Sequence, residues 1–311
     1  MAERDRIAAL MERPRPTIRA AMAALLLAVL GMWAASLIAG RLSLPAGAGR
    51  EFAYDALFYL PFVALPVALY ALRRPGIAAS MRLNPLPALP TLAVISAALL
   101  SVYAASALDG LWALLLNALG LHAPEVSVEL STSGALSLAI LHSAAIPAIF
   151  EELLCRALVF SAFESRGTRL AAWVSALFFA LMHGNVYGLP AYLLVGAVSA
   201  FLVFALDSLY AGIAYHTVYN TVILMLLYAI PHATESAESA PATPWTSIAI
   251  DALCIGLLLY LTLRMLDRRR AALGIQPVPR TRTPLRGSEW ALIAAVALVC
   301  AATSALVLMG V

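Results

Sequence analysis

The sequence predicts an all-α fold, a polytopic bundle of eight or nine transmembrane helices that encloses a polar cavity within the membrane. The first observation that predicts it is composition. Hydrophobic residues make up 63% of the 311 residues and charged residues 12%, with a mean hydropathy of +0.90. Soluble domains have about 45–50% apolar and about 25% charged residues. The composition therefore excludes an ordinary soluble protein.

The second observation is the recurrence of apolar segments along the chain, since a membrane-spanning helix needs about 20 such residues. Segments 168–183 and 189–206 are short and 133–163 is long, so one short pair could be re-entrant and the number stays at eight or nine. No internal repeat is visible. The predicted helices are 20–39, 52–72, 88–107, 133–163, 168–183, 189–206, 208–230, 246–266 and 290–310.

The third observation is the placement of the basic residues, all of which are arginines. They cluster before the first predicted helix, after the second, after the fourth, and between the eighth and the ninth. With nine helices these clusters share one side of the membrane, which the positive-inside rule identifies as the cytoplasm. We therefore expect a multi-pass protein of the cell (inner or plasma) membrane with a cytoplasmic N-terminus. The membrane topology explains the excess of basic over acidic residues, so the positive net charge does not indicate a nucleic-acid partner.

Three charged residues lie close together inside the long apolar segment, namely Glu151, Glu152 and Arg156. Each charge at membrane depth costs about 2.5–3.5 kcal/mol even on the lenient insertion scale, so such groups pair, face a wet cavity or do chemistry. Residues four apart share a helix face, so Glu152 and Arg156 are expected to form an ion pair. Glu151, rotated by about 100°, is left to face a cavity as a general base. Pro147, one turn earlier, removes a backbone hydrogen bond and leaves polar backbone available there.

Two further apolar segments carry polar side chains, His183 in one and His216 with Asn220 in the other. Because His216 and Asn220 are four residues apart, both reach one spot from a single helix. An imidazole and a carboxamide at that spot could hold a developing oxyanion. Together with Glu151, the two histidines could equally hold zinc, because two histidines and one carboxylate form a common catalytic set.

Two other polar residues have simpler interpretations. His142 lies nine residues before Glu151, which is the opposite face of an ideal α-helix, so we expect it to be structural. Glu164 stands at a helix end beside Arg166 and Arg169, and we expect it on the surface.

The charged motif resembles the first motif of the CPBP family of intramembrane proteases, which includes type II CAAX prenyl endopeptidases and bacteriocin-processing or immunity relatives. That motif has two glutamates and an arginine after a proline, matched here by Glu151, Glu152 and Arg156 with Pro147 upstream. Ala157 stands where the family usually has glycine, and it is small enough to keep close packing.

The other two family motifs follow in order. A phenylalanine four residues before a histidine is matched by Phe179 and His183, and His-x-x-x-Asn by His216 and Asn220. The resemblance covers about 139–228, less than a third of the chain.

The resemblance implies an endopeptidase that cleaves near the C-terminus or leader of a membrane-associated protein or peptide. In the glutamate-dependent mechanism proposed for the family, the residue matching Glu151 activates water with help from the one matching His183. Those matching His216 and Asn220 stabilise the oxyanion. In the metalloprotease alternative, zinc would be held by Glu151, His183 and His216. We favour the mechanism without a metal or other cofactor, because the chain lacks the His-Glu-x-x-His spacing of a helix-borne zinc site.

The expected partners are the lipid bilayer and a membrane-associated substrate; the substrate's identity, the membrane face of the cavity and the oligomeric state stay open. Two other classes of function are alternatives. A non-catalytic scaffold or bacteriocin-immunity protein of the same fold would tolerate degraded motifs, and these are intact. A proton-coupled transporter would be expected to show repeat symmetry. The chain is expected to divide into a cytoplasmic basic segment (1–19), N-terminal transmembrane helices (20–132), a catalytic core (133–230) and C-terminal transmembrane helices with an Arg-rich cytoplasmic loop (231–311).

Overall fold

The computed structural model describes residues 15–39, 68, 81–123, 130, 132–234, 245–280 and 283–308, and all regular structure within them is helical. The elements are α2 (Ile18–Ala39), α6 (Ala88–Ala118), α7 (Ser133–Ala139), η2 (Ile140–Ala145), α8 (Ile146–Glu152), η3 (Leu153–Phe160), α9 (Ser161–Glu164), α10 (Thr168–Met182), α11 (Leu189–Leu206), α12 (Leu209–Thr234), α13 (Trp245–Ala272) and α14 (Gly287–Leu308).

Five helices among the described residues are long and apolar enough to cross a membrane, and two further apolar helices are shorter. The five are Ala88–Ala118, Ser133–Glu164, Leu189–Leu206, Leu209–Ala229 and Gly287–Leu306, and the shorter ones are Ile18–Ala34 and Thr168–Met182. All seven coincide with predicted helices, which confirms a multi-pass helical membrane protein. The predicted helix 52–72 lies outside the described residues apart from residue 68. The number of eight or nine spans therefore stays a prediction.

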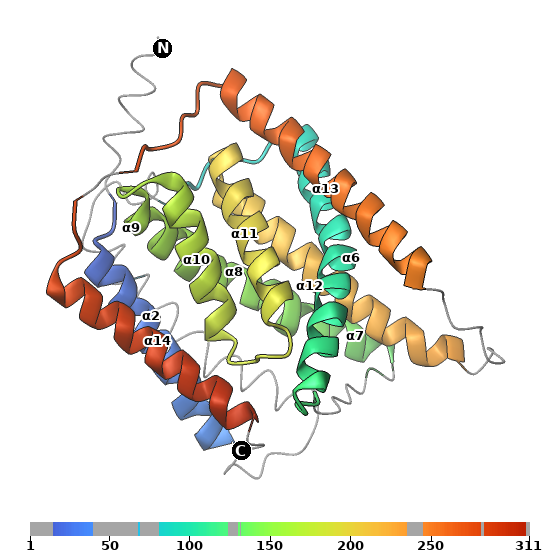
Figure 1. Cartoon of the computed structure of the whole chain (residues 1–311). Helices are drawn as coiled ribbons and strands as arrows, with labels where there is room; N and C mark the ends of the chain where they lie inside the picture. The colour runs from blue at the N-terminus through green and yellow to red at the C-terminus, as the bar shows by residue number, and fades with distance from the viewer. Residues whose placement is uncertain are drawn as a thin grey trace.

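The helices pack into one bundle with the motif-bearing helix, α7 to α9, inside it (Figure 1). The helices α2 and α14 lie side by side on one flank, α13 lies along α6 on the other, and α8, α10, α11 and α12 lie between them. In lipid a helix satisfies its backbone internally, and small residues let neighbouring helices approach. Gly196 of α11 is one of these, because a Cβ there would lie 2.9 Å from the Cα of Ala176 on α10.

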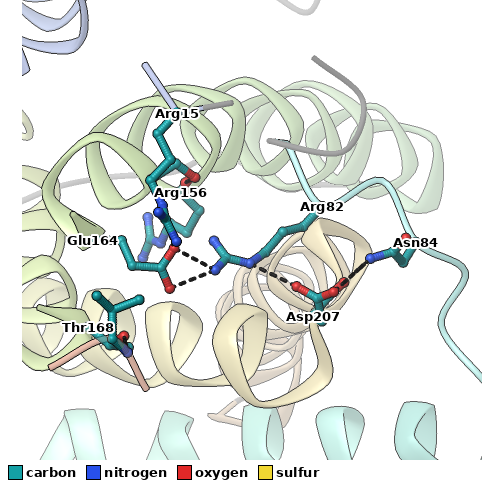
Figure 2. A network of polar contacts seen from close by, with 9 residues as sticks. Arg15, Arg82, Asn84, Arg156, Glu164, Thr168 and Asp207 are labelled. Atoms are coloured by element: carbon teal, nitrogen blue, oxygen red, sulfur yellow. Dashed lines mark hydrogen bonds and ion pairs between the residues drawn. The ribbon is translucent and has the colours of Figure 1, made fainter. Parts of the chain in front are cut away.

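A network of ion pairs and hydrogen bonds ties together one end of the bundle (Figure 2). Arg82 donates through Nη2 to both carboxylate oxygens of Glu164, at 2.8 and 2.9 Å, and pairs through Nε with Asp207 at 3.1 Å. Arg15 Nε lies 3.4 Å from Glu164 Oε2, and Asn84 donates to Asp207 Oδ2 at 3.0 Å. Glu164 is only 4% exposed. The prediction that Glu164 lies on the surface is wrong. Its main partner, Arg82, is 82 residues away in the chain, so the residues around Glu164 do not indicate this contact.

This network shows which terminus of each helix lies at this end of the bundle. It joins the starts of α2, α6 and α12 to the ends of α9 and α11, and Arg166 beside it pairs with Glu289 at the start of α14. We call this the basic end. At the opposite end, which we call the far end, the indole of Trp112 in α6 donates to the backbone oxygen of Val186 between α10 and α11 at 2.8 Å. The arginine-bearing segments that the structure describes thus gather at one end, as the topology predicts.

Candidate active site

The motif helix departs from α-helical geometry on both sides of its two glutamates. The π-helical stretches η2 and η3 flank α8 directly, and π-helical turns are frequent at functional sites. Pro147 explains part of this, because proline cannot donate to the carbonyl four residues earlier. That carbonyl belongs to Ser143, and it accepts a long hydrogen bond of 3.4 Å from the side-chain amide of Asn220 on α12. The proline therefore leaves a polar backbone atom available to the site.

Glu152 and Arg156 are both 0% exposed and lie together as their spacing predicts, with 3.2 Å between Arg156 Nε and Glu152 Oε2. Ser199 of α11 donates to Glu152 Oε2 at 2.6 Å, and Arg156 Nη2 donates to the backbone oxygen of Gly196 at 3.0 Å. The guanidinium also lies 4.5 Å from the centre of the Phe179 ring. Each buried charge thus has polar partners on neighbouring helices, which is what an apolar interior requires.

Glu151 points to a different set of neighbours. Its Oε2 lies 3.8 Å from Nε2 of His183 and 3.9 Å from Nε2 of His216. The three side chains come from three helical segments, α8, the end of α10 and α12. Glu151 is 5% exposed and His216 is 3% exposed. The structure therefore brings together the carboxylate and both imidazoles that the motifs single out.

Both imidazoles are oriented by partners at Nδ1. His183 Nδ1 lies 2.7 Å from the carbonyl oxygen of Phe179, and since a carbonyl only accepts, the proton of a neutral ring is assigned to Nδ1. Nε2 of His183 is then an acceptor directed at the Glu151 side. The His183 ring also stacks on that of Tyr192, with 4.1 Å between ring centres. Phe179 thus contacts the site in two ways: its carbonyl oxygen faces Nδ1 of His183, and its ring packs against the Arg156 guanidinium.

His216 connects the two glutamates. Its Nδ1 lies 3.3 Å from Glu152 Oε1, while its Nε2 faces Glu151. The ring of Phe179 meets that of His216 edge-on at 5.4 Å between centres. Glu152 therefore contacts both Arg156 and His216, a wider role than the ion pair that the sequence predicts.

These groups border a cavity of about 350 Å³. Its described lining residues include all four predicted catalytic residues and the two motif-support residues; they are His142, Ser143, Pro147, Glu151, Phe179, His183, Tyr192, Val195, His216, Tyr219, Asn220, Ile223 and Leu224. His142 lines the same cavity as Glu151, so its predicted place on the opposite helix face is wrong. The prediction assumed α-helical geometry, and the π-helical turns of η2 contain more residues per turn, which rotates His142 toward the cavity.

Three residues that contact the predicted site residues were missed from the sequence. Tyr192 stacks on His183. Ser199 bonds Glu152, as described above. Gly212 of α12 makes room for Glu152, because a Cβ there would lie 2.5 Å from Glu152 Oε2, 2.7 Å from Val203 Cγ2 and 2.9 Å from Ser199 Oγ. The available signal was the presence of small residues within apolar helices, which often marks close helix packing in membranes.

The distances between the proposed zinc ligands differ from those of a zinc site. The atoms that bind one tetrahedral zinc lie about 3.3 Å apart, since each is about 2.0–2.1 Å from the metal. The two histidine nitrogens lie 3.8 and 3.9 Å from Glu151 Oε2, about half an ångström more. Within the part of the chain that the structure describes, no group of three His, Cys, Asp or Glu side chains is arranged to hold a metal ion. As placed, Glu151 is about half an ångström too far from each imidazole to share a zinc ion with it, and the mechanism without a metal stays a prediction.

The fold and the site define a multi-pass helical membrane protein with a carboxylate–imidazole site buried inside its bundle. Residues 133–222 match the family model Rce1-like, described as type II CAAX prenyl endopeptidase Rce1-like. This segment contains all four predicted catalytic residues and the Glu152–Arg156 pair. The match confirms the resemblance to CAAX-type intramembrane proteases over this segment, which is less than a third of the chain. No curated protein and no solved structure matches the chain.

Proposed function

We propose that the protein is an intramembrane endopeptidase in which Glu151 activates a water molecule without a metal ion. The observation that carries the proposal is the convergence of Glu151 Oε2 with Nε2 of His183 and of His216 at the wall of one cavity. A carboxylate placed beside a bound water molecule can take a proton from it as the water attacks a substrate, which is general base catalysis.

The first step is deprotonation of water. A water molecule placed between Glu151 and His183 donates one hydrogen to the carboxylate and the other to Nε2, which is free to accept because Nδ1 donates to Phe179 O. Glu151 takes the proton as the oxygen attacks the substrate carbonyl, and it returns this proton to the leaving nitrogen when the carbon–nitrogen bond breaks. His183 orients the water, and Tyr192, stacked on its ring, keeps the imidazole in place.

The second step is stabilisation of the oxyanion by His216 and Asn220, which line the same cavity from α12. Asn220 donates through Nδ2, now directed at Ser143 O. For His216 to donate from Nε2 while Nδ1 faces Glu152, the ring must carry both protons. Glu152 is the group that balances this charge, as the aspartate does in a Ser-His-Asp triad. The four charges would then be two carboxylates, one guanidinium and one imidazolium, which sum to zero.

The substrate we propose is a membrane-associated protein or peptide, cleaved within or next to the bilayer. Localisation to the cell membrane with a cytoplasmic N-terminus is part of the proposal, and it follows from the arginines at the basic end by the positive-inside rule.

The test is the change Glu151→Gln, which keeps shape and removes proton acceptance. Purified protein is incubated with a library of internally quenched fluorescent peptides in ¹⁸O-labelled water, and mass spectrometry detects ¹⁸O in the new carboxyl groups. We expect turnover to fall by about 10²–10⁴-fold with an unchanged melting temperature. Glu289→Gln, the same substitution at the start of α14, is the matched control and should keep wild-type turnover. A Glu151→Gln protein that cleaves at a near wild-type rate would remove Glu151 from the role of base.

A further inference from the structure

Another cavity lies on the flank of the bundle formed by α13, between that helix, α10 and α11. Its volume is about 390 Å³, and we call it the flank cavity. It shares no described lining residue with the cavity that contains Glu151. The proposed hydrolysis therefore gives it no role, and its own walls must indicate what it binds.

The flank cavity lies at the basic end, because that is where the end of α13 is held. The backbone oxygen of Val278, just after α13, accepts a hydrogen bond from the backbone N–H of Thr168 at 3.0 Å, and the N–H of Val278 donates to Thr168 Oγ1 at 2.8 Å. Thr168 begins α10, which follows α9 directly. The guanidinium of Arg270, in the last turns of α13, lies 5.3 Å from the centre of the Phe204 ring near the end of α11. The last turns of α13 therefore meet the start of α10 and the end of α11.

The wall nearest the basic end carries an excess of positive charge. Arg169 at the start of α10 lines it together with Arg264 and Arg270 of α13, and the carboxylate among the described lining residues is that of Asp267. Asp267 Oδ1 lies 2.9 Å from Arg270 Nε, whereas its Oδ2 is 3.9 Å from Arg264 Nη1. Asp267 thus pairs mainly with Arg270, which is 9% exposed. The exposed Arg169 and Arg264 supply the charge that this carboxylate does not balance.

The wall toward the far end is apolar. On α13, Leu263 and Tyr260 precede Arg264, and they face Phe201 of α11 and Ala172 of α10 across the cavity. Tyr260 lines the cavity and is nevertheless 56% exposed, and Trp173, next to Ala172, is 61% exposed. Exposed side chains of this kind on membrane helices contact lipid. The apolar half of the flank cavity is therefore continuous with the lipid-facing surface of α10 and α13.

We propose that the flank cavity binds one anionic phospholipid, with its phosphate at Arg169 and Arg264 and an acyl chain along the apolar wall. Guanidinium groups bind phosphate through charge-assisted hydrogen bonds that are often bidentate. Basic pockets between transmembrane helices are suited to anionic lipid headgroups. A zwitterionic headgroup adds a cation, which the excess positive charge disfavours. The bound lipid links α13 to α10, and its binding does not depend on the proposed endopeptidase function.

The test measures lipid binding to the purified full-length protein. The protein is stripped of lipid in detergent and titrated with phosphatidylglycerol or with phosphatidylcholine of the same acyl chains, and native mass spectrometry counts the lipids bound per chain. The test variant is Arg169→Gln/Arg264→Gln. The matched control is Arg268→Gln/Arg280→Gln, which removes the same charge from two exposed arginines outside the flank cavity. The melting temperature of each variant without lipid is measured alongside.

We expect one phosphatidylglycerol per chain, bound at least tenfold more tightly than phosphatidylcholine. Each arginine near an anionic headgroup contributes about fivefold in affinity, so the test variant should bind about 30-fold more weakly. The control should bind within about twofold of the wild type. Equal affinity for the two lipids, or equal losses in the test variant and the control, would overturn the proposal.

Two further measurements separate a lipid from a free anion. Ala172→Phe fills the apolar half of the cavity and keeps the arginines, so it should weaken phosphatidylglycerol binding at least tenfold. Unchanged binding in a folded Ala172→Phe protein would show that no acyl chain enters, and would overturn the proposal. Inorganic phosphate in tenfold excess over the lipid should displace little of it. Complete displacement would make the flank cavity a site for free phosphate instead.

Discussion

Replacing Arg156 by alanine should destabilise the protein strongly. The side chain is 0% exposed, and its removal leaves the equally buried Glu152 without the guanidinium 3.2 Å away. Breaking a buried pair by removing one partner costs about 3–5 kcal/mol. At about 2–4 °C per kcal/mol for a chain of several hundred residues, the melting temperature in detergent should fall by about 6–20 °C. The lost contacts with Gly196 O and the Phe179 ring act in the same direction.

The assay is thermal unfolding of purified protein, read together with expression level and turnover. The double change Glu152→Gln/Arg156→Gln removes both charges and should be milder than Arg156→Ala. The matched control is Arg268→Ala, an exposed arginine on α13, which should change stability by about 0.5 kcal/mol or less. If Arg156→Ala is as stable as the wild type and yet inactive, Arg156 acts in the chemistry, and its assignment as the partner of a structural pair is wrong.

Three further predictions concern the metal, the packing around Glu152 and the oxyanion. Activity should survive a strong chelator, and elemental analysis should find far less than one metal ion per chain; stoichiometric metal that tracks activity and is lost with His183 or His216 would overturn the metal-free mechanism. Gly212→Ala should cost about 1–3 kcal/mol through overpacking, whereas Gly256→Ala on α13, where a Cβ meets nothing within 4 Å, should not; equal melting temperatures for the two would contradict the close approach at Glu152. Asn220→Ala should lower kcat by about 10²–10³-fold with a nearly unchanged KM, and a change in KM alone would argue against an oxyanion contact.

The parts of the site that the sequence predicts correctly depend on local geometry or on the cost of charge in lipid. The pair Glu152–Arg156 follows from a spacing of four residues, and the exposed carbonyl near the site follows from the missing N–H of Pro147. The seven helices that the structure describes as apolar follow from segment length and hydropathy. These predictions need only one helix at a time, so tertiary packing does not alter them.

The errors have equally specific causes. The position of His142 depends on a π-helical stretch that composition does not indicate, and a change in residues per turn moves a side chain from one helix face to another. Glu164 is buried by Arg82, which comes from a distant part of the chain. Ser199 and Gly212 reach Glu152 only because α11 and α12 pack against the motif helix. Contacts between helices are set by the packing of whole helices, which no single segment encodes.

The arrangement of charge also explains how hydrolysis can take place at a site closed off by apolar helices. In the proposed mechanism the proton lost by water moves to Glu151 as the oxygen attacks, so the negative charge leaves the carboxylate and appears on the substrate oxygen. The net charge of the buried cluster does not change; it is displaced by a few ångströms, from Glu151 toward the donors His216 and Asn220. Moving a charge between fixed dipoles requires little reorganisation, whereas creating one in a medium of low dielectric constant is costly. Glu152 and Arg156, packed behind the site, hold His216 in position for that displacement without taking part in it.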